Sequence, residues 1–374
     1  MTTQLKREIS TIDKRKERVT YVDFAKGVTI LFVIIGHMSQ ISIILKYFIF
    51  SFHMPMFFLT SGLFIRDYSI GKNLKRSIKN LLIPYSVIHF LCMGIELIRS
   101  IVVSKELGQA DVSIVARYVK AYLGGMSYAS KVFTSFESVW LIWFICCLFL
   151  ARFFYILLSH VIKDKGLRFI AILFISYDGV VLGKLGYYLP WSFDVAMFAV
   201  IYLAAGDLIA KTKLFEKWHT KTYIIMIPFC VWFVCLLQKE MLELAVRTYG
   251  NYIGAVVMSI AGCVFVLGVS RELDGWNETI ARFFRWCGRR SIVILAFHLF
   301  EMRFLDWNIV YTLIPVSGSW ILETILHVVL ILSASYIIVR QIKRCFIQHF
   351  IWSRFADGGL NHGRLYYAIS ANCL

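Results

Sequence analysis

Charged residues are scarce in this chain of 374 residues: they make up 17% of it, against about a quarter in an average soluble protein. Proline is rarer still, with five residues, and no Pro/Gly/Ser-rich linker divides the sequence. Hydrophobic residues make up 59% and gather in stretches of about twenty, the length of a membrane-spanning helix. The composition excludes a soluble domain. It predicts an all-α polytopic membrane protein rather than a barrel, whose segments would be shorter and alternating.

About ten membrane spans are predicted, over residues 24–42, 47–65, 81–103, 138–159, 167–183, 188–210, 222–238, 252–270, 291–312 and 319–339. Of the 40 Lys and Arg residues, 28 fall in the N-terminus, alternate loops and the tail, and 8 in the opposite loops. Because basic loops stay in the cytoplasm, both termini are predicted to be cytoplasmic, with the chain in a cell inner (plasma) membrane. Contact of these loops with anionic membrane lipid accounts for most of the net charge of +17, so no nucleic acid partner is expected.

Several motifs are also missing. None of the nine cysteines falls in a predicted exterior loop, so no disulfide framework is expected. No CxxC or Cys/His cluster has metal-ligand spacing, and we expect no metal. The sequence has no GxGxxG, P-loop, GxSxG or HExxH pattern, which argues against a mononucleotide fold and against the common hydrolase sites.

The predicted organisation has three parts: a basic cytoplasmic segment over 1–20, a membrane domain over 21–345 and a poorly ordered cytoplasmic tail over 346–374. Two connections carry further expectations. The exterior connection at about 104–137 is mildly polar, and we expect it to form a short amphipathic helix that serves as a lid. The stretch 271–290 mixes charges with aromatic residues, which predicts a helix lying along the membrane surface.

Ionisable residues inside the first two spans are the main functional signal, because such groups are costly at membrane depth. Asp23, Lys26 and His37 lie on the first span and His53 on the second. The step of eleven residues from Lys26 to His37 covers about 16 Å of helix and returns to nearly the same face. His53 is expected at a depth similar to that of His37, with Pro55 kinking the helix and making room for a cavity. Two imidazoles facing one cavity suit a general base and a partner that orients or stabilises the reacting group.

Three other features have two interpretations each. His298 is either a hydrogen-bonded structural histidine or a substrate contact. Asp194 is either a polar wall of the cavity or a carboxylate at a helix start near the interface. The basic run that holds Arg66, Arg76 and Lys79 either reflects ordinary membrane topology or binds the phosphates of a cytoplasmic cofactor.

Several motifs occur in a characteristic order: Tyr21-Val-Asp-Phe-Ala-Lys-Gly27, Ile34-Ile-Gly-His37, Phe52-His-Met-Pro-Met-Phe-Phe58 with Ser61-Gly62, Leu81-Leu-Ile-Pro-Tyr85, Leu189-Pro-Trp-Ser-Phe-Asp194 with Gly206, and Cys287-Gly-Arg-Arg-Ser-Ile-Val-Ile-Leu-Ala-Phe-His298. This ordered set, spread over most of residues 19–300, resembles the membrane acyltransferase-3 family, especially its fucose 4-O-acetylase-like branch. The resemblance implies transfer of an acetyl group from acetyl-CoA to a hydroxyl of a cell-envelope or secreted carbohydrate, or of a lipid-linked sugar.

The resemblance also implies roles for individual residues. Lys26 and His37 match the family's functional basic residue and histidine on the first span. Arg76-x-x-Lys79 stands where the family has two arginines three positions apart, so it keeps the charge but loses one bidentate fork. We expect His37 to act as the base, or to accept the acetyl group and pass it on. Asp23 would position Lys26, and His53 would assist at the carbonyl.

Two rival interpretations belong to other classes of protein. A membrane transporter or exporter would use the same buried groups as a polar conduit, although the internal repeats and paired broken helices common in transporters are not found. A non-catalytic membrane scaffold would explain the buried charges least well, and it predicts that changes at Lys26 and His37 have no effect.

Overall fold

The computed structural model describes residues 19–38, 41–65, 68–104, 108–128, 130–215, 223–238, 241–308 and 320–356. Within these ranges the chain is helical and forms no β-strand, only two isolated bridges, Met126 with Ser138 and Glu243 with Thr248. The predicted all-α class is therefore confirmed. The chain divides into two units, Met1–Trp320 and Ile321–Leu374.

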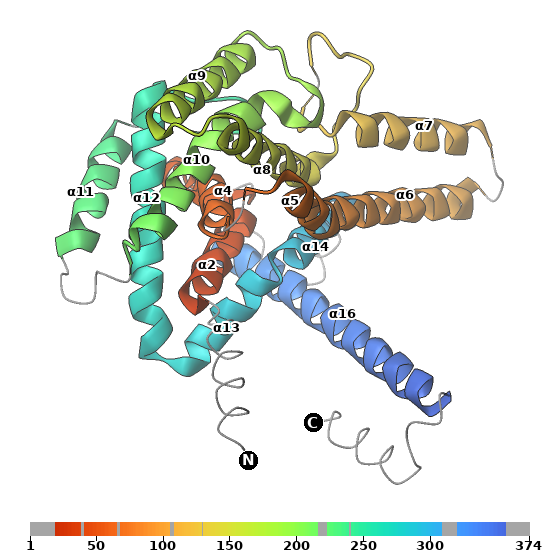
Figure 1. Ribbon diagram of the computed structural model, residues 1–374. Helices are drawn as coiled ribbons and strands as arrows, with labels where there is room; N and C mark the ends of the chain where they lie inside the picture. The colour runs from red at the N-terminus through yellow and green to blue at the C-terminus, as the bar shows by residue number, and fades with distance from the viewer. Residues whose placement is uncertain are drawn as a thin grey trace. The chain divides into compact units, whose positions relative to one another are not determined.

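The first unit holds most of the helices (Figure 1), namely α2 (Thr20–Gly36), α3 (Ile43–Phe50), α4 (His53–Leu63), α5 (Ile70–Ser77), α6 (Ile83–Ser104), α7 (Gln109–Gly124), α8 (Trp143–Val161), α9 (Lys165–Lys184), α10 (Phe193–Thr212), α11 (Tyr223–Leu237), α12 (Tyr252–Trp276), α13 (Glu278–Arg289) and α14 (Ser291–Phe304). A π-helical segment over Ile78–Leu82 joins α5 to α6, and short 3₁₀ segments over Trp140–Ile142 and Pro190–Ser192 lead into α8 and α10. The described part of the second unit is α16 (Trp320–Ala356) without its first residue, Trp320, which belongs to the first unit.

Seven helical segments are long and apolar enough to cross a membrane, namely Ile43–Leu63, Ile70–Ser104, Trp140–Val161, Lys165–Lys184, Pro190–Thr212, Tyr252–Trp276 and Trp320–Ile342. The other three predicted spans coincide with shorter helices: α2 has 17 residues, α11 has 15 and α14 has 14. The chain is thus a multi-pass membrane protein. The count of ten spans and the side on which the termini lie stay predictions.

Glycines set the closest helix contacts of the first unit. A Cβ atom added at Gly27 on α2 would lie 2.0 Å from the carbonyl oxygen of Phe284 on α13, and one added at Gly206 on α10 would lie 2.0 Å from that of Leu59 on α4. Only a residue without a side chain allows the backbones to approach this closely. The glycines of the sequence motifs therefore hold α2 against α13 and α4 against α10.

The predicted surface helix over 271–290 is shorter than expected. The long apolar helix α12 continues to Trp276, and Asn277 then begins α13 by accepting hydrogen bonds from the backbone of Thr279 at 2.9 Å and of Ile280 at 3.1 Å. One face of α13 is buried against α2, because Ala281 and Gly288 are covered. This helix therefore braces the start of α2, which carries Asp23 and Lys26.

The predicted helix of the 104–137 connection is present as α7. It lies alongside α6 (Figure 1) and is held there by hydrogen bonds from Tyr85 to the carbonyl of Tyr122 at 2.9 Å and between His89 and the carbonyl of Tyr118 at 2.9 Å. No residue of α7 lines the cavity described below, so the helix does not act as the expected lid in this structure.

Candidate active site

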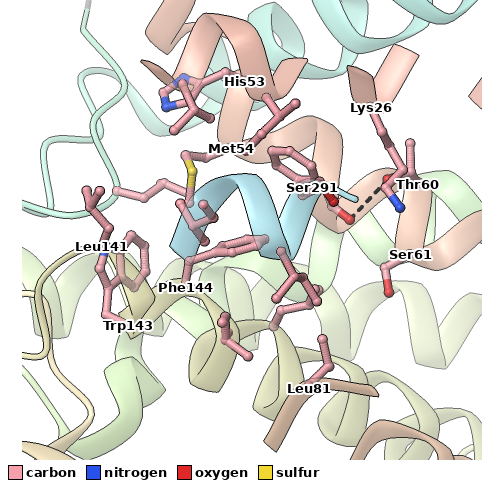
Figure 2. A pocket seen from close by; sticks show the side chains of 18 of the residues that line it. Lys26, His53, Met54, Thr60, Ser61, Leu81, Leu141, Trp143, Phe144 and Ser291 are labelled. Atoms are coloured by element: carbon pink, nitrogen blue, oxygen red, sulfur yellow. Dashed lines mark hydrogen bonds between the residues drawn. The ribbon is translucent and has the colours of Figure 1, made fainter. Parts of the chain in front are cut away.

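A cavity of about 300 Å³ lies in the first unit, between α2, α4 and α8. Such a volume is at the lower limit of the range for small-molecule sites. Figure 2 shows that Lys26 and Ser61 lie toward one side of the cavity, and His53 and Trp143 toward the other. Apolar and aromatic side chains form the wall between these groups.

Two histidines of the cavity wall make the same kind of hydrogen bond. His37 lies at the end of α2, where its Nδ1 is 2.7 Å from the carbonyl oxygen of Val33. His53 begins α4, and its Nδ1 is 2.9 Å from the carbonyl oxygen of Ile49. A carbonyl only accepts hydrogen bonds, so each Nδ1 carries a proton and each neutral ring keeps a lone pair on Nε2. Both rings can therefore accept a proton or a hydroxyl hydrogen bond.

A third histidine and a glutamate lie behind His37. The ring of His298 on α14 packs edge to face against His37 with 5.3 Å between ring centres, and its Nδ1 lies 3.0 Å from a carboxylate oxygen of Glu301. Both side chains are buried and neither lines the cavity. A carboxylate behind a pair of imidazoles stabilises positive charge on them, which is the charge that His37 would gain on taking up a proton.

The cationic side of the cavity, called the basic end below, is formed by Lys26, Arg76 and Arg152. The guanidinium of Arg152 is buried on α8 and is fixed by its neighbours. Its Nε donates to the hydroxyl of Ser77 at 3.2 Å, and its Nη1 donates to the carbonyl of Ser61 at 3.1 Å and to the hydroxyl of Ser61 at 2.5 Å. No described residue accepts a hydrogen bond from its Nη2. The basic end thus offers a preoriented donor to an anionic or carbonyl group.

The other side of the cavity, called the hairpin end below, is closed by the segment 241–250 between α11 and α12. Glu243 and Thr248 exchange backbone hydrogen bonds of 2.8 and 3.0 Å, which folds the segment into a tight hairpin. Glu243, Leu244 and Ala245 line the cavity. Burial raises the pKa of Glu243 above its usual range, while the positive charge of Lys46 acts in the opposite direction.

A buried ion pair anchors this hairpin. Arg247 and Asp194 both have fully buried side chains, and the two hydrogen bonds between them are 2.8 and 3.2 Å long. Arg247 also donates to the hydroxyl of Ser127 and, at 2.8 Å, to the carbonyl of Ala245, while Asp194 accepts from the backbone of Leu189 at 3.1 Å. Burial alone would lower the pKa of Arg247, but the hydrogen bond and charge of Asp194 outweigh it and raise the pKa. The hairpin is therefore fixed to the start of α10 and to the loop after α7.

A family model for an acyltransferase domain, acyltransferase-3, matches residues 19–340. The matched region contains every residue of the cavity wall. The chain belongs to the acyltransferase-3 family. It is an acyltransferase, and its helices make it a membrane-embedded one. No curated protein and no solved structure matches the chain.

The cavity of this acyltransferase brings together four of the predicted site residues, Lys26, His37, His53 and Arg76. The other predicted residues that the structure describes do not line it. Asp23 is buried on α2 beside α13, away from the cavity wall, and Arg66 is outside the described residues.

Lys79 is exposed and does not line the cavity, although Arg76 does. The wider turn of the π-helical segment that begins at Ile78 separates two residues that an α-helix would place on neighbouring faces. Such π-helical turns are frequent at functional sites.

Two of the three features with open interpretations, Asp194 and His298, are buried off the cavity. Asp194 is a carboxylate at the start of α10, as one interpretation had it, and it is paired with Arg247. His298 is the hydrogen-bonded partner of Glu301 and packs against His37 rather than lining the cavity. Neither side chain is placed to touch a molecule bound in the cavity.

Sequence reasoning missed Arg152 and Glu243 as cavity residues, and Arg247 as an anchor. Arg152 could have been found, because an arginine inside an apolar helix is a functional candidate in itself. Glu243 and Arg247 lie in a short polar connection, and no sequence pattern indicates that this connection folds back onto the cavity.

Metal-ligating side chains do not cluster in the described ranges of residues. No group of three or more His, Cys, Asp and Glu side chains gathers there in a way that could hold a metal ion.

Proposed function

We propose that this acyltransferase transfers an acetyl group from acetyl-CoA to a hydroxyl of a cell-envelope or secreted carbohydrate, in a cell inner membrane. The observation that carries the proposal is the cavity itself, which joins a cationic end to two imidazoles with lone pairs on Nε2. The resemblance of the motifs to the fucose 4-O-acetylase-like branch supports the choice of donor and acceptor.

The donor would enter from the basic end. The phosphates of acetyl-CoA suit exposed cations, and Arg76 is exposed beside the cavity, with Arg66 and Lys79 nearby in sequence. The pantetheine arm is uncharged and can pass through an apolar channel. Arg152 would then donate from Nη2 to a carbonyl of that arm, and the thioester would lie near His37.

Transfer needs one proton acceptor at the acceptor hydroxyl. His37 Nε2 takes the hydroxyl proton while the oxygen attacks the thioester carbonyl. The carbon–sulfur bond then breaks, and the imidazolium returns its proton to the leaving thiolate, giving the acetyl ester and free CoA thiol. Glu301, behind His298, stabilises the transient positive charge on His37, and Lys26 supplies a positive charge on the same helix toward the donor.

The tautomer of His53 changes the role expected for it. A neutral ring whose Nδ1 donates to Ile49 has no N–H to offer to a developing oxyanion. Its Nε2 can instead accept a hydrogen bond from a second hydroxyl and so orient the acceptor. The proposed role of His53 is therefore positioning of the carbohydrate rather than assistance at the carbonyl.

Membership of an acyltransferase family argues against the transporter interpretation, and no feature of the cavity favours it. A covalent acetyl-histidine is the other route through His37. The direct route is preferred because it needs a single transfer of the acetyl group.

The test compares envelope glycan from cells lacking the protein, cells restored with the wild type and cells restored with His37→Ala, at matched membrane levels. Removing a general base costs about 10²- to 10⁴-fold in rate, so only the wild type should restore O-acetyl ester. His160→Ala, at an exposed histidine near the end of α8, serves as the control and should restore it too. Full ester content with His37→Ala would contradict the proposal.

A further inference from the structure

Glu243 is a charged group in the cavity wall that the proposed reaction does not use. The remaining charged groups of the wall are the cations Lys26, Arg76 and Arg152, all at the basic end. Glu243 is half-buried on the hairpin, and its charged neighbour Lys46 lies over the ring of Phe50, which packs against His53. Figure 2 shows His53 on the side of the cavity away from Lys26. The two ends of the cavity therefore differ in the sign of their charge.

The carboxylate of Glu243 has no hydrogen-bond donor from the described part of the chain. Its backbone pairs with Thr248, and its only charged neighbour there is Lys46, whose ammonium lies over the ring of Phe50, 5.2 Å from the ring centre. A half-buried carboxylate is costly unless donors reach it. Water or a bound molecule with several hydroxyl groups would supply them.

The surroundings of this carboxylate fit a carbohydrate. Figure 2 shows Leu141 and Trp143 on the same side of the cavity as His53. The segment that leads to them is joined to the hairpin, because Ser138 donates to the carbonyl of Ser127 at 2.5 Å and Ser127 donates to the carbonyl of Ala245 at 2.6 Å. The wall at the hairpin end therefore offers an aromatic and apolar surface together with one acceptor group. Pockets that combine apolar walls with a few convergent polar groups orient their ligands through those groups. A sugar ring, with an apolar C–H face and hydroxyls at its edge, matches both parts.

The hairpin holds Glu243 in a fixed position. The hairpin is held by the buried pair of Arg247 and Asp194, and Arg247 bonds to the carbonyl of Ala245, two residues from Glu243. A binding residue on a rigid support discriminates between hydroxyl positions better than one on a loose loop.

From these observations we infer that Glu243 binds hydroxyl groups of the carbohydrate acceptor and that the hairpin 241–250 determines which acceptor is accepted. This inference rests on the proposed function and extends it to the acceptor side. Donor recognition would belong to Arg76 and Arg152, and acceptor recognition to Glu243 with His53.

The experiment uses the purified full-length protein in detergent, labelled acetyl-CoA and envelope glycan from cells that lack the protein. Glu243→Gln keeps the size of the side chain and removes its charge. Because hydrogen bonds to charged groups are the stronger ones, the variant should raise the glycan KM about tenfold, with the KM for acetyl-CoA unchanged and kcat within about twofold. Glu243→Asp should lie between Glu243→Gln and the wild type. The matched control is Glu272→Gln, on the exposed face of α12, which should leave every constant unchanged.

Glycan binding is measured separately as the rise in Tm that the glycan causes without donor. The wild type should show this rise, and Glu243→Gln should lose most of it. An unchanged glycan KM and an unchanged rise in Tm in Glu243→Gln would overturn the inference and leave the proposed function intact. A wild type that neither transfers label nor responds to glycan would overturn the proposed function, and the inference with it.

Discussion

At its basic end the cavity is built from side chains on the helices α2, α5 and α8, whereas at its hairpin end it is lined by a short segment between two helices. Arg152 reaches the basic end from α8 and is fixed by hydroxyls on α4 and α5. Glu243 reaches the hairpin end only because Arg247, four residues later, is paired with Asp194 at the start of α10. The basic end therefore depends on helix packing, and the hairpin end on one buried ion pair.

This difference suggests a division of labour between the two ends. A donor such as acetyl-CoA is chemically constant, and rigid helices suit it. Acceptors differ among proteins that transfer acyl groups, and a hairpin can change in sequence without disturbing the helices that hold His37 and Arg152. The predictions below disturb one end at a time.

The largest effect is expected from breaking the anchor of the hairpin. Asp194→Ala leaves the guanidinium of Arg247 buried without its counter-charge, which should lower the free energy of unfolding by about 3–5 kcal/mol. Unfolding of the detergent-solubilised protein measures this change. Asp194→Ala combined with Arg247→Met should recover part of the loss. Asp178→Ala, at an exposed aspartate on α9, is the control. If Asp194→Ala and Asp178→Ala had the same free energy of unfolding, the ion pair would not be the anchor of the hairpin.

A somewhat smaller effect is expected at the basic end. Arg152→Met removes a fixed, charged donor. A hydrogen bond that involves a charged group is worth about 1.5–3 kcal/mol, so the KM for acetyl-CoA should rise roughly 10- to 100-fold. Arg152→Lys keeps the charge without the planar fork and should give an intermediate value. Arg282→Met, at an exposed arginine on α13, should have no effect. A donor KM unchanged in Arg152→Met would show that this end does not bind the donor.

The smallest effect concerns the helix packing that both ends share. Gly206→Ala places a Cβ atom against the backbone of Leu59, so α4 and α10 must separate, at a cost of about 1–3 kcal/mol of stability. Gly94→Ala on α6 is the matched control, because no atom lies within 4 Å of the Cβ it would add. Thermal unfolding of both variants tests the contact between α4 and α10. Equal Tm values for Gly206→Ala and Gly94→Ala would show that this contact is absent.

Much of the helical part of this protein could be predicted from its sequence. Apolar runs of about twenty residues marked the positions of the helices, since length and hydropathy are local properties. The spacing of Lys26 and His37 placed both on one helix face, and the structure puts both on the cavity wall. Arg76 and Lys79 were predicted to act together from the basic run and the resemblance, but only Arg76 lines the cavity, because the π-helical turn between them has no recognisable sequence pattern.

The hairpin end could not be predicted, and the reason is physical. Asp194 and Arg247 are distant in sequence, and their pairing depends on how α10 and the 241–250 segment meet in space. The tautomer of His53 likewise depends on a carbonyl that only the folded turn before α4 places beside it. Loops that meet through long-range contacts leave no periodic pattern in the sequence.

The central claim, that the two ends of one cavity bind the two substrates, is tested most directly by a crossed kinetic measurement. The KM values for acetyl-CoA and for envelope glycan are determined for the wild type, Arg76→Gln, Glu243→Gln and the double variant. Arg76→Gln should raise only the donor KM and Glu243→Gln only the acceptor KM, with the two effects adding in the double variant because the sites are separate. If either single change raised both KM values equally, or raised the value assigned to the other end, the division of the cavity into a donor end and an acceptor end would be wrong.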